Sequence, residues 1–415
     1  MRTPLHFKAS DTGIRKRLAA FSAYHDRAVQ SPSWPFARIR QGVPGRSASR
    51  RSKPMQPQLL RFASNDYLGL SRHPRTKAAL LAAWEQYGSG TAGSPLLGGR
   101  YEICRELEKE LAQLHGMEDA LVLSSTYAAN LAVLQGLLSA RDTALLDQLS
   151  HTSIRDGAKL AGCTTMLFRH NDVSDLQRRL DNLDPSRCLI FVDSVYSMEG
   201  AFARVSEIAK TARKTGALLA IDEAHAVGVV GKRGEGVVRA LGLHRQVDII
   251  TGSLGKSLAA HGGYVASSRT ICAFLRYAAH SYVFSSGLSP INAAVALEAL
   301  VLLKRGKELH KLQRNIEHVR QLFAQHGLPV PKDRTGILPI HVGNEAATLA
   351  MSSALENAGL SVSPSIFPAV PKGKGMLRVS ISALHRKRDL ARAVATLARV
   401  VQPMDPRVAK RTDSV

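Results

Sequence analysis

Apolar residues along this chain follow two alternating patterns between residues 75 and 300. Four segments have helical spacing or composition: 80–87, 100–115, 127–138 and 206–215. Four short apolar runs bounded by turn residues lie between or after them: 120–123, 189–192, 218–221 and 248–251. Continuous apolar runs that alternate with helices are typical of strands buried on both faces of a mostly parallel sheet. The pattern therefore predicts an α/β domain whose sheet is flanked by helices.

The C-terminal part of the chain has a different pattern. A long helical stretch covers 291–326, and the runs 336–342 and 376–381 have the character of strands. Such an order predicts a smaller α+β domain after the first one. The expected division is a basic N-terminal arm and linker at 1–60, a large domain at 61–300, a smaller domain at 301–402 and a tail at 403–415.

The charge of the chain is strongly positive, with a formal net charge of +23 over 415 residues. Part of it lies in 38–53, where Gly, Pro, Ser and Arg cluster without periodicity, and the rest is spread through stretches such as 204–214 and 386–399. Dispersed charge is typical of a solvated surface, and the aromatic interleaving of single-strand binders is missing. We therefore rank nucleic acid low as a partner. A basic nucleic-acid-binding or regulatory protein with a relic cofactor site is the alternative outside enzymology.

Membrane spans, a signal peptide and paired or metal-binding cysteines are the sequence features that bear on the location of the protein. No apolar run approaches the roughly 18 residues of a membrane span, and charged residues near the N-terminus leave no room for a signal-peptide core. We expect a cytoplasmic protein without a membrane span. The four cysteines show no metal-ligand spacing, so neither a metal site nor a disulfide framework is expected at Cys104, Cys163, Cys188 and Cys272.

Candidate chemistry gathers where the predicted strands end, which is where ligands bind in this architecture. Asp222 ends the run 218–221, and a carboxylate buried there requires a partner such as a protonated pyridine nitrogen. Lys256 follows the next run in a Gly-Ser-Leu-Gly-Lys segment, and a lysine amine holds an aldehyde as a Schiff base. The pair indicates a pyridoxal-phosphate (PLP) site.

Three other strand ends give weaker signals. Segment 124–130 predicts a helix start whose backbone N–H groups suit a phosphate, although an ordinary N-cap without a ligand explains it equally well. His151 lies at another junction of this kind and Ser197 follows the run 189–192, but a lone histidine or serine at such a place is more often structural. His225 is placed to donate to the phenolic oxygen of the cofactor. The Asp-Glu-Ala-His string also occurs in helicase-type NTPases, but no Gly-x-x-x-x-Gly-Lys-Ser/Thr loop precedes it.

Taken in order, these segments resemble the α-oxoamine synthases, fold-type I PLP enzymes that condense an amino acid with an acyl-CoA. The resemblance covers residues 60 to 400. Its matching pieces are 65–70, 124–130, 150–153, 197–200, 222–225, 252–256, 284–286 and 377–380. The family implies a seven-stranded type of sheet, a homodimer with a shared active site, and PLP as the cofactor.

The resemblance also implies a role for each matching residue. Lys256 holds the cofactor aldehyde, Asp222 pairs with the pyridinium nitrogen, His225 contacts the phenolic oxygen, His151 stacks on the ring face and Ser197 lies beside the cofactor oxygen. These residues form the catalytic and ring-binding part of the expected site.

Phosphate and substrate contacts complete the implied site. The phosphate is held by the backbone of Thr126 and Tyr127, by Ser253, and by Ser286 from the neighbouring subunit. Arg378, helped by Asn65, receives the substrate carboxylate, since a guanidinium matches a carboxylate fork.

The expected reaction joins a small amino acid to an acyl-CoA or acyl-carrier-protein thioester with loss of carbon dioxide. Segment 170–172 and the residues around Ser150 look most like the 8-amino-7-oxononanoate synthase branch of biotin biosynthesis. Serine palmitoyltransferase-like and 2-amino-3-ketobutyrate CoA ligase-like activities remain open, as does an aminotransferase or lyase of the same fold.

Three positions depart from the family pattern. Pro95 stands where many members have arginine, which leaves substrate selection open, and Cys104 replaces a common histidine. Thr126 replaces a glycine of the phosphate turn, so the backbone there must not require a positive φ.

Overall fold

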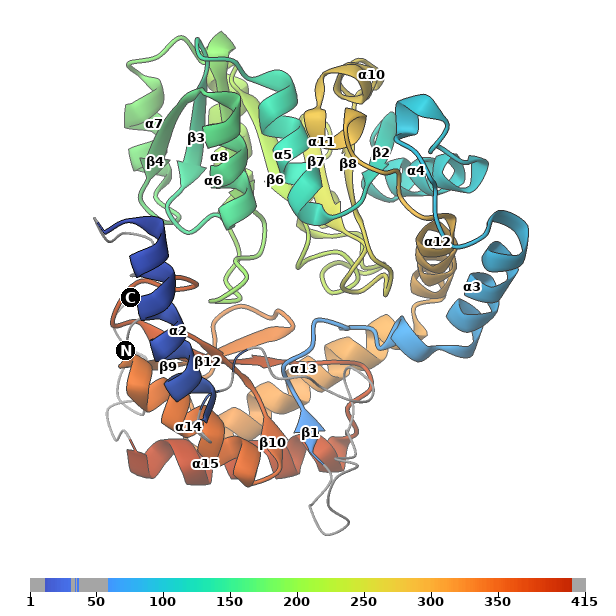
Figure 1. The fold of residues 1–415 in the computed structure, drawn as a ribbon. Helices are drawn as coiled ribbons and strands as arrows, with labels where there is room; N and C mark the ends of the chain where they lie inside the picture. Colours follow the sequence, from blue (N-terminus) through green and yellow to red (C-terminus); the bar gives the residue numbers. More distant parts are fainter. Residues whose placement is uncertain (1–11, 31–33, 35, 37–58, 405–415) are drawn as a thin grey trace. The chain divides into compact units, whose positions relative to one another are not determined.

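The computed structural model describes residues 12–30, 34, 36 and 59–404 (Figure 1). Two compact units are present, one formed by Asn65–Gln313 and the other by the described residues before Asn65 and from Arg314 onward. The predicted linker at 38–53 and the tail beyond residue 404 lie outside the described residues.

The first unit is built on a seven-stranded sheet with the order β2-β8-β7-β6-β5-β3-β4 (Figure 1). The strands are β2 Asp119–Leu123, β3 Thr143–Asp147, β4 Thr164–Phe168, β5 Cys188–Asp193, β6 Leu218–Asp222, β7 Ile249–Ser253 and β8 Gly263–Ser267. Strands β3 to β7 run parallel to one another, and β8 is antiparallel to both β7 and β2. The mostly parallel α/β sheet is thus confirmed.

Helices fill the connections between these strands, and α4, α5 and α10 pack directly on the sheet. They are α3 Pro74–Tyr87, α4 Glu102–His115, α5 Thr126–Leu137, α6 Thr152–Ala161, α7 Val173–Leu180, α8 Val205–Thr215, α9 Val237–Ala240, α10 Arg269–Ala278, α11 His280–Val283 and α12 Pro290–Arg305. Short 3-10 turns occur at η1 Leu70–Arg72, η2 Pro95–Leu97 and η3 Pro185–Arg187.

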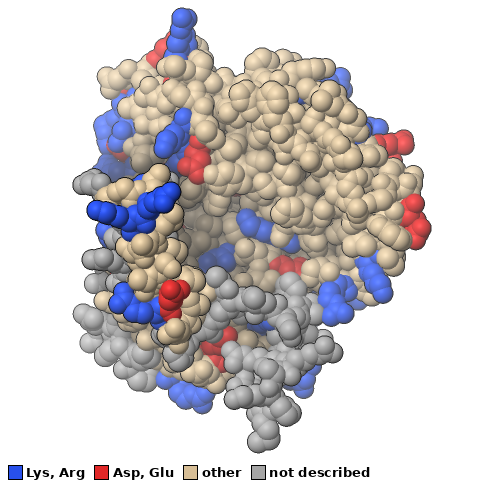
Figure 2. Space-filling model, viewed as in Figure 1, with Lys and Arg blue, Asp and Glu red and all other residues tan. Residues whose placement is uncertain are grey.

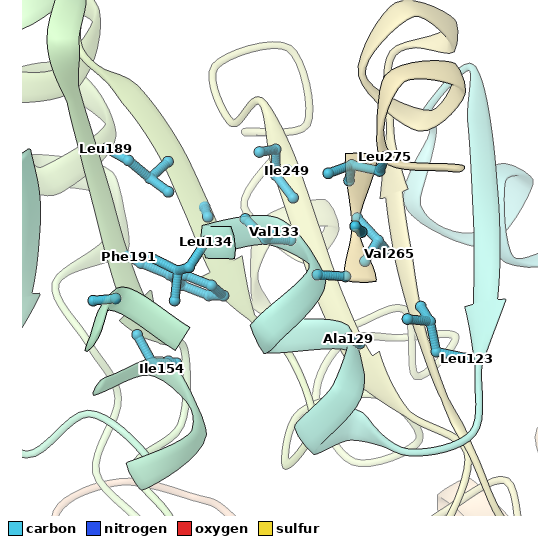
Figure 3. Packing of buried hydrophobic residues seen from close by; sticks show 14 of the residues in the cluster. Leu123, Ala129, Val133, Leu134, Ile154, Leu189, Phe191, Ile249, Val265 and Leu275 are labelled. Atoms are coloured by element: carbon cyan, nitrogen blue, oxygen red, sulfur yellow. The ribbon is translucent and has the colours of Figure 1, made fainter. Parts of the chain in front are cut away.

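The apolar core of this unit lies between α5 and the strands (Figure 3). Val133 and Leu134 on α5 pack in one buried cluster with Leu189, Phe191 and Ile249 of the central strands. Burial of large aliphatic and aromatic side chains contributes about 1.5–3 kcal/mol each. Helix α5 is therefore fixed on the sheet by its apolar face, which sets the position of its first turn.

The second unit holds an antiparallel sheet in the order β11-β12-β9 and a parallel pair of β1 with β10. Its elements are α2 Ile14–Gln30, β1 Leu60–Arg61, β9 Ile337–Gly343, α14 Glu345–Asn357, β10 Leu360–Ser361, β11 Ser363–Ser365, β12 Gly375–Ser380 and α15 Lys387–Met404. The small antiparallel sheet agrees with the expected α+β character.

The helical stretch predicted over 291–326 is two helices, α12 and α13 Lys307–Gln325. Gly306 ends α12 with a φ of 74°, a left-handed conformation that glycine adopts at little cost. Across the described part of the chain, no helix is both long enough and apolar enough to cross a bilayer.

Candidate active site

The carboxyl ends of β5, β6 and β7 bring the predicted cofactor residues to one edge of the sheet. Asp222 is the last residue of β6, opposite Asp193 on β5 and Thr251 on β7. Lys256 lies in the loop after β7 and is half-buried. The charges of Asp222 and Lys256 both act on the pKa of His151. Three predicted residues from separate segments therefore share one site.

Asp222 is buried and held by two hydrogen bonds. Its Oδ2 accepts from Nδ2 of Asn130 at 2.8 Å, and its Oδ1 accepts from the backbone N–H of Ala224 at 2.8 Å. Neither donor is charged, and no Lys or Arg of the described residues forms an ion pair with this carboxylate. A buried carboxylate with neutral partners alone is costly, so the site suits a cationic ligand atom such as a pyridinium N–H.

His225 lies in the turn that follows β6 and is buried. Its Nδ1 is 2.8 Å from the hydroxyl of Tyr67, which also donates to Oδ1 of Asn65 at 3.4 Å. Tyr67 therefore links His225 to Asn65, the predicted substrate residue. Tyr67 lies in the matching segment 65–70 but received no role from the sequence, where its position two residues after Asn65 was the available signal.

His151 is the N-cap of α6, and its Nδ1 accepts from the backbone N–H of Ser153 at 3.3 Å. Its own backbone N–H donates to Oδ2 of Asp193 at 3.1 Å. The residue is exposed as a whole, yet burial on one side lowers the pKa of its imidazole; Lys256 adds to this effect and Asp222 opposes it.

Asp193 lies beside His151 and Asp222 but was not among the candidate residues read from the sequence. It is buried, and its pKa is raised well above the ordinary value, first by burial and then by the negative charge of Asp222. The available signal was its position, because Asp193 ends the run 189–192 as Asp222 ends 218–221.

The start of α5 is the place where the sequence predicts a phosphate cradle. Ser125 caps the helix by accepting from the backbone N–H of Ala128 at 3.0 Å, and the first-turn N–H groups that follow have no partner within the helix. Thr126 is helical and is not among the described residues with a positive φ, so its replacement of glycine is tolerated. A side chain at Gly263 on β8 would come within 2.5 Å of Ser125 and Thr126, so this glycine permits the close approach.

The other residues predicted to contact the phosphate or the cofactor oxygen lie at the end of β7 and in loops of the same unit. Ser253 ends β7 and accepts from the backbone N–H of Gly255 at 3.1 Å. Ser197 is half-buried in the turn after β5. Ser286 is exposed after α11, and its contribution from a neighbouring subunit stays a prediction.

Arg378 lies on β12 in the second unit and is buried. Its Nη1 donates to Oγ of Ser380 at 3.1 Å, which holds the guanidinium in a defined orientation. Asn65 is half-buried at the beginning of the first unit. Their joint action on a substrate carboxylate stays a prediction.

The donor set fits PLP. One edge of the sheet offers a buried carboxylate for the ring nitrogen, an amine for the aldehyde and a helix start for the phosphate. Each group comes from a different strand end, as expected for a ligand bound across the carboxyl edge of a parallel sheet.

Known proteins match both the sequence and the fold. The family model described as aminotransferase class I and II matches residues 57–397. An 8-amino-7-oxononanoate synthase from Chromohalobacter salexigens is 40% identical over 326 residues, which cover 78% of this chain and 84% of that protein. A serine palmitoyltransferase from Sphingobacterium spiritivorum is 35% identical over 345 residues, covering 83% and 86%.

Solved structures extend the similarity. The serine palmitoyltransferase of S. paucimobilis, solved with PLP and myriocin, superposes with a TM-score of 0.88 at 29% identity and covers 95% of this chain and 99% of its own. The 8-amino-7-oxononanoate synthase of Francisella tularensis gives a TM-score of 0.72 at 26% identity, covering 83% and 98%. The chain belongs to the α-oxoamine synthases, PLP-dependent acyltransferases built on the class I and II aminotransferase fold.

Proposed function

We propose that this protein condenses a small amino acid with an acyl thioester and releases carbon dioxide and a free thiol. The product is an α-amino ketone. The observation that carries this proposal is the meeting of Lys256, Asp222 and His151 at one edge of the sheet, beside the start of α5. The family supplies the reaction class, and this chain retains the charged groups that the reaction needs.

PLP, when bound, supplies an electron-poor ring that accepts the electron pair left at the α-carbon of an amino acid. Asp222 keeps a proton on the ring nitrogen, because its buried charge favours the protonated form. Lys256 would hold the cofactor aldehyde, and its amine, when free, would take the α-proton of the amino acid. Backbone N–H groups of Thr126 and Tyr127, with Ser253, hold the phosphate.

Substrate orientation is assigned to Arg378 and Asn65, which bind the carboxylate of the amino acid. His151 covers the ring face and hydrogen-bonds an anionic or carbonyl oxygen of the substrates. The overall balance is one amino acid plus one acyl thioester giving one α-amino ketone, one carbon dioxide and one thiol. The strongly basic chain suits a polyanionic donor such as acyl-CoA.

Two substrate pairs are candidates. The 8-amino-7-oxononanoate synthase assignment, alanine with a pimeloyl thioester, is supported by the 40% identity to the Chromohalobacter enzyme. The serine palmitoyltransferase assignment, serine with a palmitoyl thioester, is supported by the superposition that covers 95% of this chain. We rank the 8-amino-7-oxononanoate synthase assignment first, because its sequence identity of 40% exceeds the 35% of the Sphingobacterium serine palmitoyltransferase.

A homodimer that shares its active site completes the proposal. Figure 2 shows a broad face over α5 and α11 that is free of Lys, Arg, Asp and Glu, although 21% of all residues are charged. Large apolar side chains are exposed on α5, α10, α11 and η2 or next to them, namely Tyr127, Phe274, Tyr277, Phe284 and Leu97. A large exposed apolar area marks an interface, and two-fold symmetry is the commonest way to cover one.

The deciding experiment adds PLP to the purified protein and then glycine, alanine or serine, followed by a panel of acyl thioesters. A visible absorbance change with one amino acid, and thiol release with one thioester, identifies both substrates. Lys256→Ala should abolish both signals. Absorbance change without thiol release would instead favour an aminotransferase or a lyase, and full activity of the variant would refute the cofactor site.

A further inference from the structure

Asn130, on α5, connects side chains of β6, β7 and α6 in the interior of the first unit. Its Nδ2 donates to Oδ2 of Asp222 at 2.8 Å and to Oγ of Ser153 at 2.8 Å. Its Oδ1 accepts from Oγ1 of Thr251 at 2.7 Å. The side chains of all four residues are buried, so water does not compete for these hydrogen bonds.

The direction of every hydrogen bond in this set is fixed by chemistry. Rotating the Asn130 amide by half a turn would place its oxygen against the Asp222 carboxylate, where two acceptors repel. The NH₂ group must therefore face Asp222 and Ser153. Because Ser153 Oγ accepts a hydrogen bond from the Asn130 NH₂ group, the hydroxyl proton of Ser153 is available for a hydrogen bond to another acceptor.

That proton points to the ring of His151. Ser153 Oγ lies 2.7 Å from Nδ1 of His151, and the backbone N–H of Ser153 reaches the same nitrogen at 3.3 Å. A backbone N–H is only a donor, so Nδ1 must be the acceptor and carries no proton. The neutral ring then holds its proton on Nε2.

We propose that Asn130 and Ser153 are positioning residues that hold His151 as a neutral imidazole with its proton on Nε2, while Asn130 also orients the carboxylate of Asp222. In this state His151 donates a hydrogen bond from Nε2 and does not accept a proton there. The Asn130 amide thus links the Asp222 carboxylate, assigned to the cofactor ring, through Ser153 to the His151 imidazole, assigned to the substrate.

The charged groups around His151 act in both directions. Asp222 on β6 and Asp156 on α6 favour protonation, whereas Lys256 and burial oppose it, and the net effect lowers the pKa. The two donors of Ser153 act in the same sense as burial, because a donor at Nδ1 stabilises the neutral ring. The chemical use of the Nε2 proton rests on the proposed function. The tautomer is inferred from the hydrogen bonds of Ser153 and does not depend on that function.

The first test is ¹⁵N-histidine NMR on the cofactor-free, full-length protein. The chain has 15 histidines, and the His151 signal is identified by its loss in His151→Gln. We expect the long-range ¹H–¹⁵N pattern of an Nε2–H ring and a titration midpoint below the ordinary value of about 6.5. A ring protonated on Nδ1, or a midpoint at or above 6.5, would overturn the proposal.

Ser153→Ala removes the hydroxyl donor but keeps the backbone N–H. The titration midpoint of His151 should rise, and the two tautomers should mix. Unchanged His151 NMR signals in this variant would show that Ser153 does not position His151.

Asn130→Asp tests the amide. A second carboxylate beside Asp222 should raise the His151 midpoint by about one unit and weaken PLP binding, measured by the cofactor absorbance. Asn315→Asp is the matched control, since Asn315 is also buried and donates from Nδ2 to two carbonyl oxygens, those of Ser382 and His385, in the second unit. Equal effects of the two changes on His151 would refute the assignment.

The outcome separates this proposal from the proposed function. An Nε2–H ring in a protein that releases no thiol would overturn the reaction assignment alone. Thiol release by a protein whose His151 is protonated on Nδ1 would overturn the positioning role alone.

Discussion

At the scale of single residues, Asp222 shows how burial and chemistry are linked. Its carboxylate is held by an amide and a backbone N–H, and both donors are neutral. This arrangement fixes the orientation of the carboxylate and leaves its charge without an ion-pair partner in the described residues. In the function proposed above, a protonated ring nitrogen would supply the missing positive charge.

Asp222→Asn preserves the shape of the side chain and removes its charge. We expect turnover to fall by at least about a hundred-fold, because the ring nitrogen loses the group that keeps it protonated. Thiol release at saturating substrate measures the effect. Asp248→Asn is the control, since Asp248 also accepts a backbone N–H, from Leu219 at 2.8 Å, but precedes β7 at the opposite edge of the sheet. Equal losses in both variants would contradict the assignment.

Sequence patterns could predict the charged residues of the site but not the network between them. Asp222 and Lys256 follow apolar runs, so their positions at strand ends were visible in the sequence. Asn130 lies inside a helix, and its contacts depend on how α5 packs against β6 and β7. No local pattern encodes that packing, since it results from tertiary burial of the helix face.

At the scale of elements, strands with a continuous run of large apolar residues were predictable, and strands without one were not. Strands β5 and β6 are nearly continuous apolar runs and were expected within one residue at each end. The edge strand β4 is mostly exposed, and β8 begins with glycine and ends with serine. Because neither has the composition of a strand buried in a parallel sheet, both were missed. Strand β3 was missed as well, since its short apolar stretch lies between Thr143 and Asp147.

Helix α4 packs on β8 through a buried polar pair. Nε2 of His115 lies 2.8 Å from the hydroxyl of Tyr264, and burial, with a contribution from Arg239, lowers the pKa of His115 to about 3. In the unfolded chain a histidine titrates near about 6.5. Between these values the unfolded state binds the extra proton, so acid destabilises the fold.

The free energy of unfolding should therefore fall as pH drops below about 6.5, by about 2 kcal/mol at pH 5 from this residue. Urea denaturation at pH 7.5 and pH 5 measures the loss. His115→Gln should be less stable at pH 7.5 and lose less on acidification, whereas His310→Gln, on the exposed side of α13, should follow the wild type. If the free energy of unfolding of His115→Gln depended on pH as in the wild type, protonation of His115 would not be the cause of the acid destabilisation.

At the scale of the whole molecule, residues of both units are assigned to one reaction. Arg378 belongs to the second unit, and Lys256 belongs to the first. Arg378→Ala should raise the amino-acid concentration needed for half-maximal absorbance change by at least about ten-fold, because a charged hydrogen-bond pair is lost. Bound PLP should be retained. Loss of the cofactor in this variant would mean that Arg378 does not bind the substrate carboxylate.

The exposed apolar face of the first unit makes a second prediction at this scale. Tyr277 and Phe284 are 77% and 79% exposed, and burial of one large aromatic side chain in an interface is worth about 1.5–3 kcal/mol. Tyr277→Asp combined with Phe284→Asp should raise the dissociation constant of the dimer by at least about a hundred-fold, as seen by sedimentation velocity. PLP affinity should fall with dimer affinity, because Ser286 from the neighbouring subunit would no longer reach the phosphate.

Leu18→Asp, at a 61% exposed position on α2, is the control and should change neither the dimer dissociation constant nor the PLP affinity. A wild-type protein that sediments as a monomer yet binds PLP and turns over would contradict the shared site.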